Sequence, residues 1–158
     1  MIRRVQSAVM PRHVRGLGLV EVMVSVLVLA VGLLGIAAMQ SLALRGGQGS
    51  LESTQAVMAT NSIVEAIRAN RNQANSYNMA KTCAVPAAIA TAASNDQAAW
   101  ITALKTTIGT GVVTDVTTCG QIAGCDSANA SNCVITVFWD DTRAGGNVSR
   151  AISVETQI

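Results

Sequence analysis

A long apolar segment with a single acid at its start constrains this chain more than any other feature. The run Val22–Met39 is interrupted only by Ser25 and two glycines, and Leu17–Val20 and Leu42–Leu44 extend it at both ends. This length is enough to cross the roughly 30 Å hydrocarbon core of a membrane as one α-helix. The sequence therefore predicts a membrane-spanning helix over residues 17–44.

The residues before this segment form a basic leader. Residues 1–16 contain four arginines, no acidic residue and the only histidine of the chain, His13. Positive charge beside a membrane segment favours a cytoplasmic amino terminus, so we expect everything after residue 44 on the opposite side of the membrane. Beyond the leader, seven basic residues stand against nine acidic ones. This balance gives no indication of the clustered basic surface that nucleic-acid binding needs.

The lone acid, Glu21, requires an explanation. A charged carboxylate deep in a membrane costs about 2.5–3.5 kcal/mol on insertion scales, and a simple anchor has no use for one. Gly16 lies five residues before it, at the end of the basic leader. The pattern formed by Gly16, Leu17 and Glu21 resembles the processing site of type IV prepilins and type II secretion pseudopilins.

The resemblance implies that a prepilin peptidase cuts after Gly16 and methylates the new amino terminus at Leu17. It also implies that Glu21 is an assembly charge. The new amine, positive at neutral pH, would lie one helical turn from Glu21. In a filament of parallel helices, the carboxylate of one subunit can meet the amine of its neighbour. That pairing removes two lone charges from a low-dielectric setting and fixes the axial register.

The likeness is specific over residues 15–45 and weak beyond them. Within it, the run Gly32–Gln40 resembles most closely that of PilV-type minor pilins. Two departures favour a minor subunit over a main filament subunit: Leu17 replaces the usual phenylalanine, and the membrane helix has no proline. The resemblance implies an α+β, type IV pilin-like fold, in which a long amino-terminal helix packs on a small antiparallel β-sheet.

We divide the chain into a basic leader, residues 1–16, a transmembrane and assembly helix, residues 17–44, and a periplasmic head, residues 45–158. The head begins with an amphipathic continuation of the helix, residues 45–80. Three glycines in Arg45–Ser50 predict a hinge or a partly melted turn, since each costs a helix about 1 kcal/mol relative to alanine. Further on, Glu65 and Arg68 are spaced to pair, and the helical period predicts a buried face formed by Val57, Ile63, Val64 and Ile67.

Residues 81–158 predict a helix followed by an antiparallel sheet of three or four strands. Ser94 and Gln97 form a capping-box pattern that opens a short helix, with Trp100, Leu104 and Ile108 in the core. Residue composition predicts strands over residues 112–117, 133–139 and 151–158, with a loop from Cys119 to Asn132. Asp140 and Asp141 fall in a turn that is expected to be solvated.

Cys83, Cys119, Cys125 and Cys133 all follow the membrane segment. Outside the cytoplasm, four cysteines predict two disulfides, and three pairings are possible. A Cys119–Cys133 bond would clamp the predicted hairpin and leave Cys125 for Cys83. A structural zinc site is disfavoured, because no close cysteine pair occurs and the only histidine lies in the leader.

No catalytic constellation, phosphate-binding loop or metal motif occurs, so we expect no enzyme activity, cofactor, metal or small-molecule substrate. We predict a structural minor pilin that helps to initiate or modify type IV pilus assembly and supports twitching motility. Its expected partners are prepilin peptidase, the other minor pilins, the major pilin and the inner membrane, and its expected final location is the pilus, near the tip. A type II secretion pseudopilin is the close alternative. An exported or membrane-anchored enzyme or binding protein is a distant one.

Overall fold

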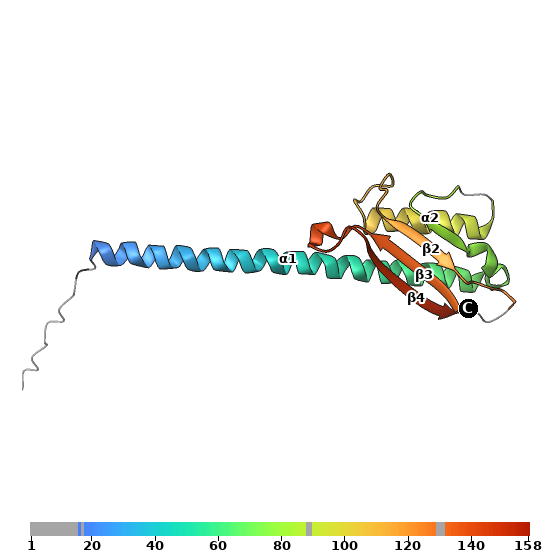
Figure 1. The fold of residues 1–158 in the computed structure, drawn as a ribbon, viewed down its shortest axis with the longest axis horizontal. Coiled ribbons are helices and arrows are strands. Elements are labelled where there is room, and N and C mark those ends of the chain that lie inside the picture. Colours follow the sequence, from blue (N-terminus) through green and yellow to red (C-terminus); the bar gives the residue numbers. More distant parts are fainter. Residues whose placement is uncertain (1–15, 17, 88–89, 129–131) are drawn as a thin grey trace, which may run out of the picture. The chain divides into compact units, whose positions relative to one another are not determined.

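The computed structural model describes residues 16, 18–87, 90–128 and 132–158. Its chain divides into two compact units, residues 1–40 and 41–158. The elements follow one another in the order α1 (Leu19–Ala69), η1 (Arg71–Tyr77), β1 (Met79–Thr82), α2 (Ala92–Thr107), β2 (Cys119–Ala123), β3 (Asn132–Trp139), η2 (Thr142–Ala144) and β4 (Arg150–Gln157) (Figure 1). The predicted α+β class, a long amino-terminal helix and a small antiparallel sheet, is confirmed.

The four strands form an antiparallel meander in the order β1-β2-β3-β4. Ile122 of β2 pairs with Ile135 of β3, and Val137 of β3 pairs with Ile152 of β4. Burial alternates along β3, as expected for a sheet with one covered face. The strands predicted over residues 133–139 and 151–158 are therefore confirmed to within one residue. β1 was not predicted, and the loop predicted from Cys119 to Asn132 is wrong for its first five residues, which form β2 and pair with β3.

α1 is helical through Arg45–Ser50, so the predicted hinge or melted turn is wrong for this structure. The reason is visible at Gly49, which is buried beneath the loop that follows β3. A Cβ atom at this position would lie 3.3 Å from Ala144 Cβ, which is closer than Cβ atoms normally approach their neighbours. It would lie 3.5 Å from Asp141 Oδ1, an ordinary van der Waals distance. Glycine lets the loop pack closely on the helix, and this packing offsets the low helix propensity.

The buried face of α1 lies slightly to one side of the predicted one. Val57 is 39% exposed, which contradicts its predicted place in the core. The helix instead buries small residues at the same level, Ala56 and Thr60, and the Thr60 hydroxyl donates to the Ala56 carbonyl at 2.9 Å. Further along, the predicted pair of Glu65 and Arg68 is confirmed at 2.8 Å.

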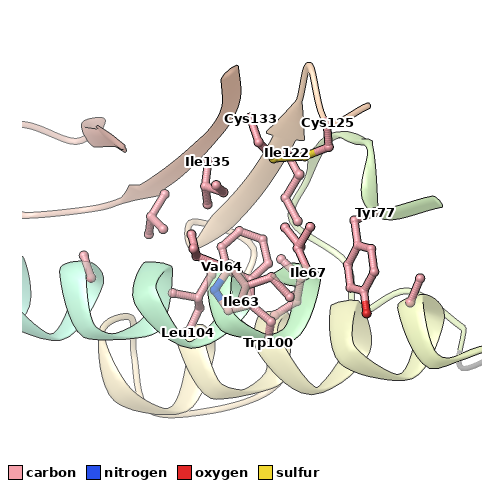
Figure 2. Packing of buried hydrophobic residues seen from close by; sticks show 14 of the residues in the cluster. Ile63, Val64, Ile67, Tyr77, Trp100, Leu104, Ile122, Cys125, Cys133 and Ile135 are labelled. Atoms are coloured by element: carbon pink, nitrogen blue, oxygen red, sulfur yellow. A yellow bond between two sulfur atoms is a disulfide. The ribbon is translucent and has the colours of Figure 1, made fainter. Parts of the chain in front are cut away.

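The core of the head lies between α1, α2 and one face of the sheet. Figure 2 shows Ile63, Val64 and Ile67 from α1 beside Trp100 and Leu104 from α2, with Ile122 and Ile135 from the sheet pointing at them. Trp100 Nε1 also donates to the Ala59 carbonyl of α1 at 3.0 Å. The prediction that Trp100, Leu104 and Ile108 are core residues is confirmed, because all three are at most 5% exposed.

α2 begins three residues earlier than the capping-box pattern predicted. Its N-cap is Thr91, whose extended backbone is typical of that position and whose side chain accepts from the Ser94 amide at 3.2 Å. Ser94 therefore lies inside the first turn, and the assignment of Ser94 as the cap is wrong.

The cysteines pair as Cys83–Cys119 and Cys125–Cys133. Two disulfides were predicted, but the suggested pairing of Cys119 with Cys133 and of Cys83 with Cys125 is wrong. That pairing assumed that the hairpin starts at Cys133. In the structure Cys119 begins β2 and lies beside the end of β1, where Cys83 follows Thr82. Cys125 and Cys133 flank the turn between β2 and β3 and close it directly.

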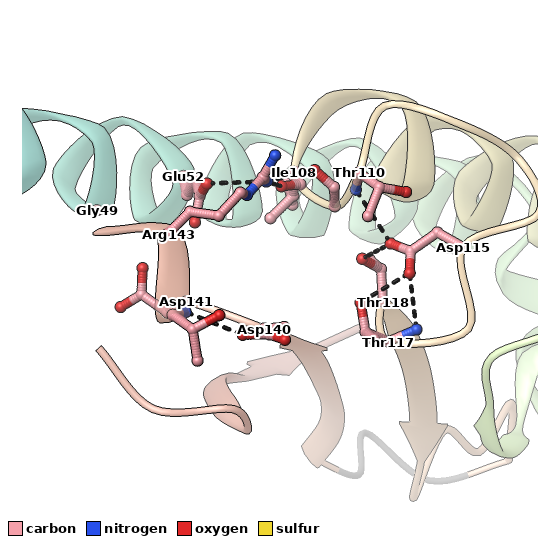
Figure 3. Close-up of polar contacts among 12 residues, drawn as sticks. Gly49, Glu52, Ile108, Thr110, Asp115, Thr117, Thr118, Asp140, Asp141 and Arg143 are labelled. Carbon is pink, nitrogen blue, oxygen red and sulfur yellow. Dashed lines mark hydrogen bonds and ion pairs between the residues drawn. The ribbon is translucent and has the colours of Figure 1, made fainter. Parts of the chain in front are cut away.

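The strand predicted over residues 112–117 is absent: this stretch is a loop of turns and bends. Its backbone groups are satisfied by side chains rather than by a ladder of strands. Asp115 accepts from the Thr117 amide at 2.8 Å and from the Thr118 hydroxyl at 2.6 Å (Figure 3). The Lys105 ammonium donates to the carbonyls of Val113 and Asp115. Such side-chain bonds compete with regular secondary structure.

Burial alone would raise the pKa of Asp115, but the hydrogen bonds from Thr118, Thr117 and Thr110 outweigh it and lower the pKa from 3.8 to about 2. A depressed carboxyl pKa contributes stability that is present above the unfolded pKa and is lost as the pH falls towards the folded one. This contribution is about 2 kcal/mol at neutral pH.

We predict that Asp115→Asn lowers the free energy of unfolding at pH 7 by up to about 2 kcal/mol, because the amide cannot accept the same charge-assisted bonds. The deficit should shrink between pH 4 and pH 2, where the wild-type carboxylate loses its own advantage. Urea denaturation of the full chain in detergent at several pH values measures this. Glu155→Gln, a change in an exposed carboxylate of β4, is the control, and equal stability of Asp115→Asn and wild type at pH 7 would contradict the assignment.

Candidate processing and assembly site

The residues of the predicted cleavage site precede the helix. Gly16 and Gly18 lie outside regular secondary structure, and a Cβ atom at either would meet nothing within 4 Å. Leu17, the predicted new amino terminus, lies outside the described residues. α1 starts at Leu19. The backbone at Gly16 is therefore open to an approaching enzyme without any unwinding of the helix.

Glu21 lies in the first turn of α1. Its amide donates to the Gly18 carbonyl at 3.0 Å, and the Val22 amide reaches the same carbonyl at 3.3 Å, which closes the turn. One turn later the Ser25 hydroxyl donates to the Glu21 carbonyl at 2.7 Å. A negative charge is favoured at the amino end of a helix, because the unpaired amides there carry partial positive charge.

The Glu21 carboxylate is exposed and, among the residues that the structure describes, makes no hydrogen bond or ion pair. It is the only acid in the first turn of α1, and apolar side chains follow it. The chemistry available to this group is the binding of a cation or of hydrogen-bond donors supplied by another molecule, or by the residues before α1.

The apolar part of α1 is uncovered. Every large apolar side chain from Leu19 to Leu44 is between 50% and 78% exposed. Within the described residues, α1 is the one helix whose length and composition allow it to cross a membrane. Soluble monomers rarely leave an apolar surface of this size in water. Lipid or other protein must therefore cover this part of α1.

A second group of ionisable residues lies where the loop after β3 meets α1 (Figure 3). The Asp141 side chain is only 3% exposed and pairs with Arg150 at 2.6 Å, and Glu52 of α1 pairs with Arg143 at 3.3 Å. Arg143 also donates to the Ile108 carbonyl at 3.2 Å, just beyond the end of α2. The expectation of a solvated turn is therefore wrong for Asp141, whereas Asp140 is half-buried and accepts from the Thr142 amide at 2.9 Å.

This cluster joins α1 and the end of α2 to the loop after β3. Glu52 Oε2, Asp141 Oδ1 and Trp139 Nε1 are buried there without a hydrogen-bond partner in the described structure. No group of three or more His, Cys, Asp or Glu side chains in the described ranges is arranged to hold a metal ion. Burial is the main cause that raises the pKa of Glu52; the Arg143 guanidinium opposes it and the Asp141 carboxylate adds to it.

Comparison with known proteins bears on the amino-terminal site. Residues 11–37 match the family model described as the prokaryotic N-terminal methylation motif, a segment that includes Gly16, Leu17 and Glu21. No curated protein and no solved structure matches the chain. Together with the long helix and the small antiparallel sheet, the motif supports a prepilin-type protein, either a type IV pilin or a pseudopilin.

The raised pKa of Glu52 has a consequence for stability. A carboxyl group whose pKa is raised by folding contributes stability that is complete below the unfolded pKa and is lost as the pH rises through the folded value. We predict that Glu52→Gln removes this loss, so that the variant gains stability relative to wild type as the pH rises above about 4.5.

Thermal unfolding of the full chain in detergent between pH 4 and pH 8 tests this prediction. Glu65→Gln is the matched control, because Glu65 is an exposed residue of the same helix and is paired with an arginine as well. Parallel pH profiles for Glu52→Gln and wild type would refute a raised pKa at Glu52.

Proposed function

We propose that this chain is a structural minor pilin of the PilV type, which takes part in initiating or modifying the assembly of a type IV pilus. The observation that carries the proposal is the position of Glu21. It is an exposed acid in the first turn of an uncovered apolar helix, within a matched methylation motif and five residues after Gly16.

In this proposal prepilin peptidase cuts between Gly16 and Leu17 and methylates the amine of Leu17. The processed helix then starts two residues before α1, with its positive amine about one turn from Glu21. When subunits assemble, the Glu21 carboxylate binds the terminal amine of a neighbouring subunit. A slip of one subunit along the filament would leave both charges unpaired in an apolar setting, so the pair sets the register.

The proposal places the protein first in the inner membrane, with the leader in the cytoplasm and the head in the periplasm. The four arginines before Gly16 support this orientation, and disulfides in the head are typical of a compartment outside the cytoplasm. Its partners would be prepilin peptidase, the major pilin and other minor pilins, and its final position would be in the pilus.

A type II secretion pseudopilin is the second candidate, because the matched motif is common to both classes. Deletion of the gene in the native host separates the two. Loss of surface pili and of twitching motility supports the minor pilin. Loss of protein secretion with intact pili would replace it with the pseudopilin.

The first prediction concerns processing. The protein extracted from membranes of its own host should begin at Leu17, and its intact mass should show one added methyl group on the terminal amine. Amino-terminal sequencing and mass spectrometry measure both. A chain that still begins at Met1, or one cut near Ala38 as by an ordinary signal peptidase, would refute the prepilin proposal.

The second prediction concerns Glu21. Glu21→Ala and Glu21→Gln should leave cleavage at Gly16 intact, since the peptide bond is unchanged, but should strongly reduce the amount of the protein in sheared pili. The neutral variants leave the neighbour's amine unpaired. Immunoblots of cleaved protein and of pilus fractions measure the two steps separately. Glu65→Ala, in the head, should be incorporated normally; incorporation of Glu21→Gln at the wild-type level would contradict the assembly role.

A further inference from the structure

A polar pocket of about 510 Å³ lies within the head, between the first residues of its helix and the chain around β4. Arg45 and Ser50 of α1 line one side, and Asp141 and Arg150 line the other. Gly49 lies between them, and its lack of a side chain keeps the pocket open beside the packed loop.

The charges of this pocket favour an anion. Two arginines line it against one aspartate, and that aspartate is buried and already neutralised by Arg150 at 2.6 Å. Arg45 is exposed, and neither its guanidinium nor the Ser50 hydroxyl makes a hydrogen bond or ion pair within the described residues. The pocket therefore offers the Arg45 guanidinium, the part of the Arg150 guanidinium that does not bind Asp141, and the Ser50 hydroxyl.

The position of Arg45 indicates where the anion comes from. It is the first charged residue after the apolar segment, and it follows Leu44 directly in the sequence. A residue at the end of a membrane-spanning segment lies at the level of the lipid headgroups, a layer only about 5–8 Å thick on each side. The planar fork of an arginine binds two oxygens of a phosphate at once, which a lysine cannot do.

We propose that this pocket binds the phosphate group of a phospholipid headgroup, with Arg45 as its main ligand and Ser50 and Arg150 as supporting donors. The site holds the head against the membrane surface while the subunit is still inserted, and it gives up the lipid when the helix leaves the bilayer. The proposal rests only on membrane insertion of residues 17–44, and does not depend on processing or on a role in pili.

The test uses the full chain in a nonionic detergent and native mass spectrometry. Three probes are added separately: phosphatidylglycerol, an uncharged diacylglycerol glycolipid with the same acyl chains, and inorganic phosphate. We expect retention of phosphatidylglycerol and not of the glycolipid. Arg45→Gln should weaken retention about fivefold, the effect of one arginine at a membrane surface. Arg71→Gln, which removes another exposed arginine of the head, should have no effect.

Two further variants separate a pocket from general attraction between charges. Arg45→Lys keeps the charge but loses the fork, and Ser50→Leu keeps every charge but fills the pocket and removes a donor; both should also weaken retention. Equal retention by these two variants and wild type would overturn the pocket. Arg45-dependent binding of inorganic phosphate without binding of phosphatidylglycerol would overturn the lipid as its source. Near-ultraviolet circular dichroism checks that each variant is folded.

The same samples distinguish this inference from the proposed function. If the protein retains phosphatidylglycerol but still begins at Met1 when isolated from its host, the phosphate site stands and the pilin proposal fails. If the protein is processed at Leu17 and retains no more phosphatidylglycerol than glycolipid, the pilin proposal stands and the phosphate site fails.

Discussion

The structure depends on one helix that meets two different demands. From Leu19 to Leu44, α1 is apolar on every side, and nothing in the described structure covers it. From Gly49 to Ile67, the same helix buries a single narrow stripe and exposes a mixture of polar and apolar side chains, Leu51 and Met58 among them. A uniformly apolar helix is satisfied by lipid or by other helices, and an amphipathic one by its own domain. The sheet and α2 cover the buried stripe of the second part and form the core of the head with it.

The amphipathic part of α1 is fixed to the head by polar as well as apolar contacts. Arg68 donates to the Thr156 hydroxyl of β4 at 3.0 Å, and Trp100 donates to the Ala59 carbonyl. Glu52 connects α1 to the loop after β3 through Arg143, which also binds the carbonyls at the end of α2. The Glu52 side chain is only 12% exposed, whereas that of Arg143 is 55% exposed. Such a pair adds little net stability, but it favours one arrangement because any other leaves the Glu52 carboxylate without its partner.

The sequence was sufficient for those features that depend on period, composition or a local pair. The long apolar amino-terminal helix, strands β3 and β4, the core positions of α2 and the Glu65–Arg68 pair are of this kind. It was not sufficient where distant residues decide the local structure. Asp115 converts a β-branched stretch into a loop because Lys105 and Thr118 meet it there, and Gly49 remains helical because a loop nearly a hundred residues later packs on it.

The same distinction explains the candidate site and the cysteines. Gly16 and Glu21 could be singled out from the sequence because a short linear pattern is enough to mark them as candidates, and both lie within the matched methylation motif. The buried pair of Asp141 and Arg150 left no such pattern, since a doublet of aspartates reads as a solvated turn until a helix and a strand enclose one of them. Cys83 could not be assigned to Cys119 without β1, whose four residues are too few to show a period.

The comparison with known proteins has a related physical basis. Residues 11–37 match a family model, although the head contains most of the fold. In the proposed function this amino-terminal segment must fit a peptidase, the thickness of a bilayer and the helices of neighbouring subunits, so that each of its residues meets an external requirement. The head needs mainly to fill its own core, and many sequences can fill a core of two helices and four strands at the right volume. In such a chain the amino-terminal segment can match a family model while the sequence of the head varies freely.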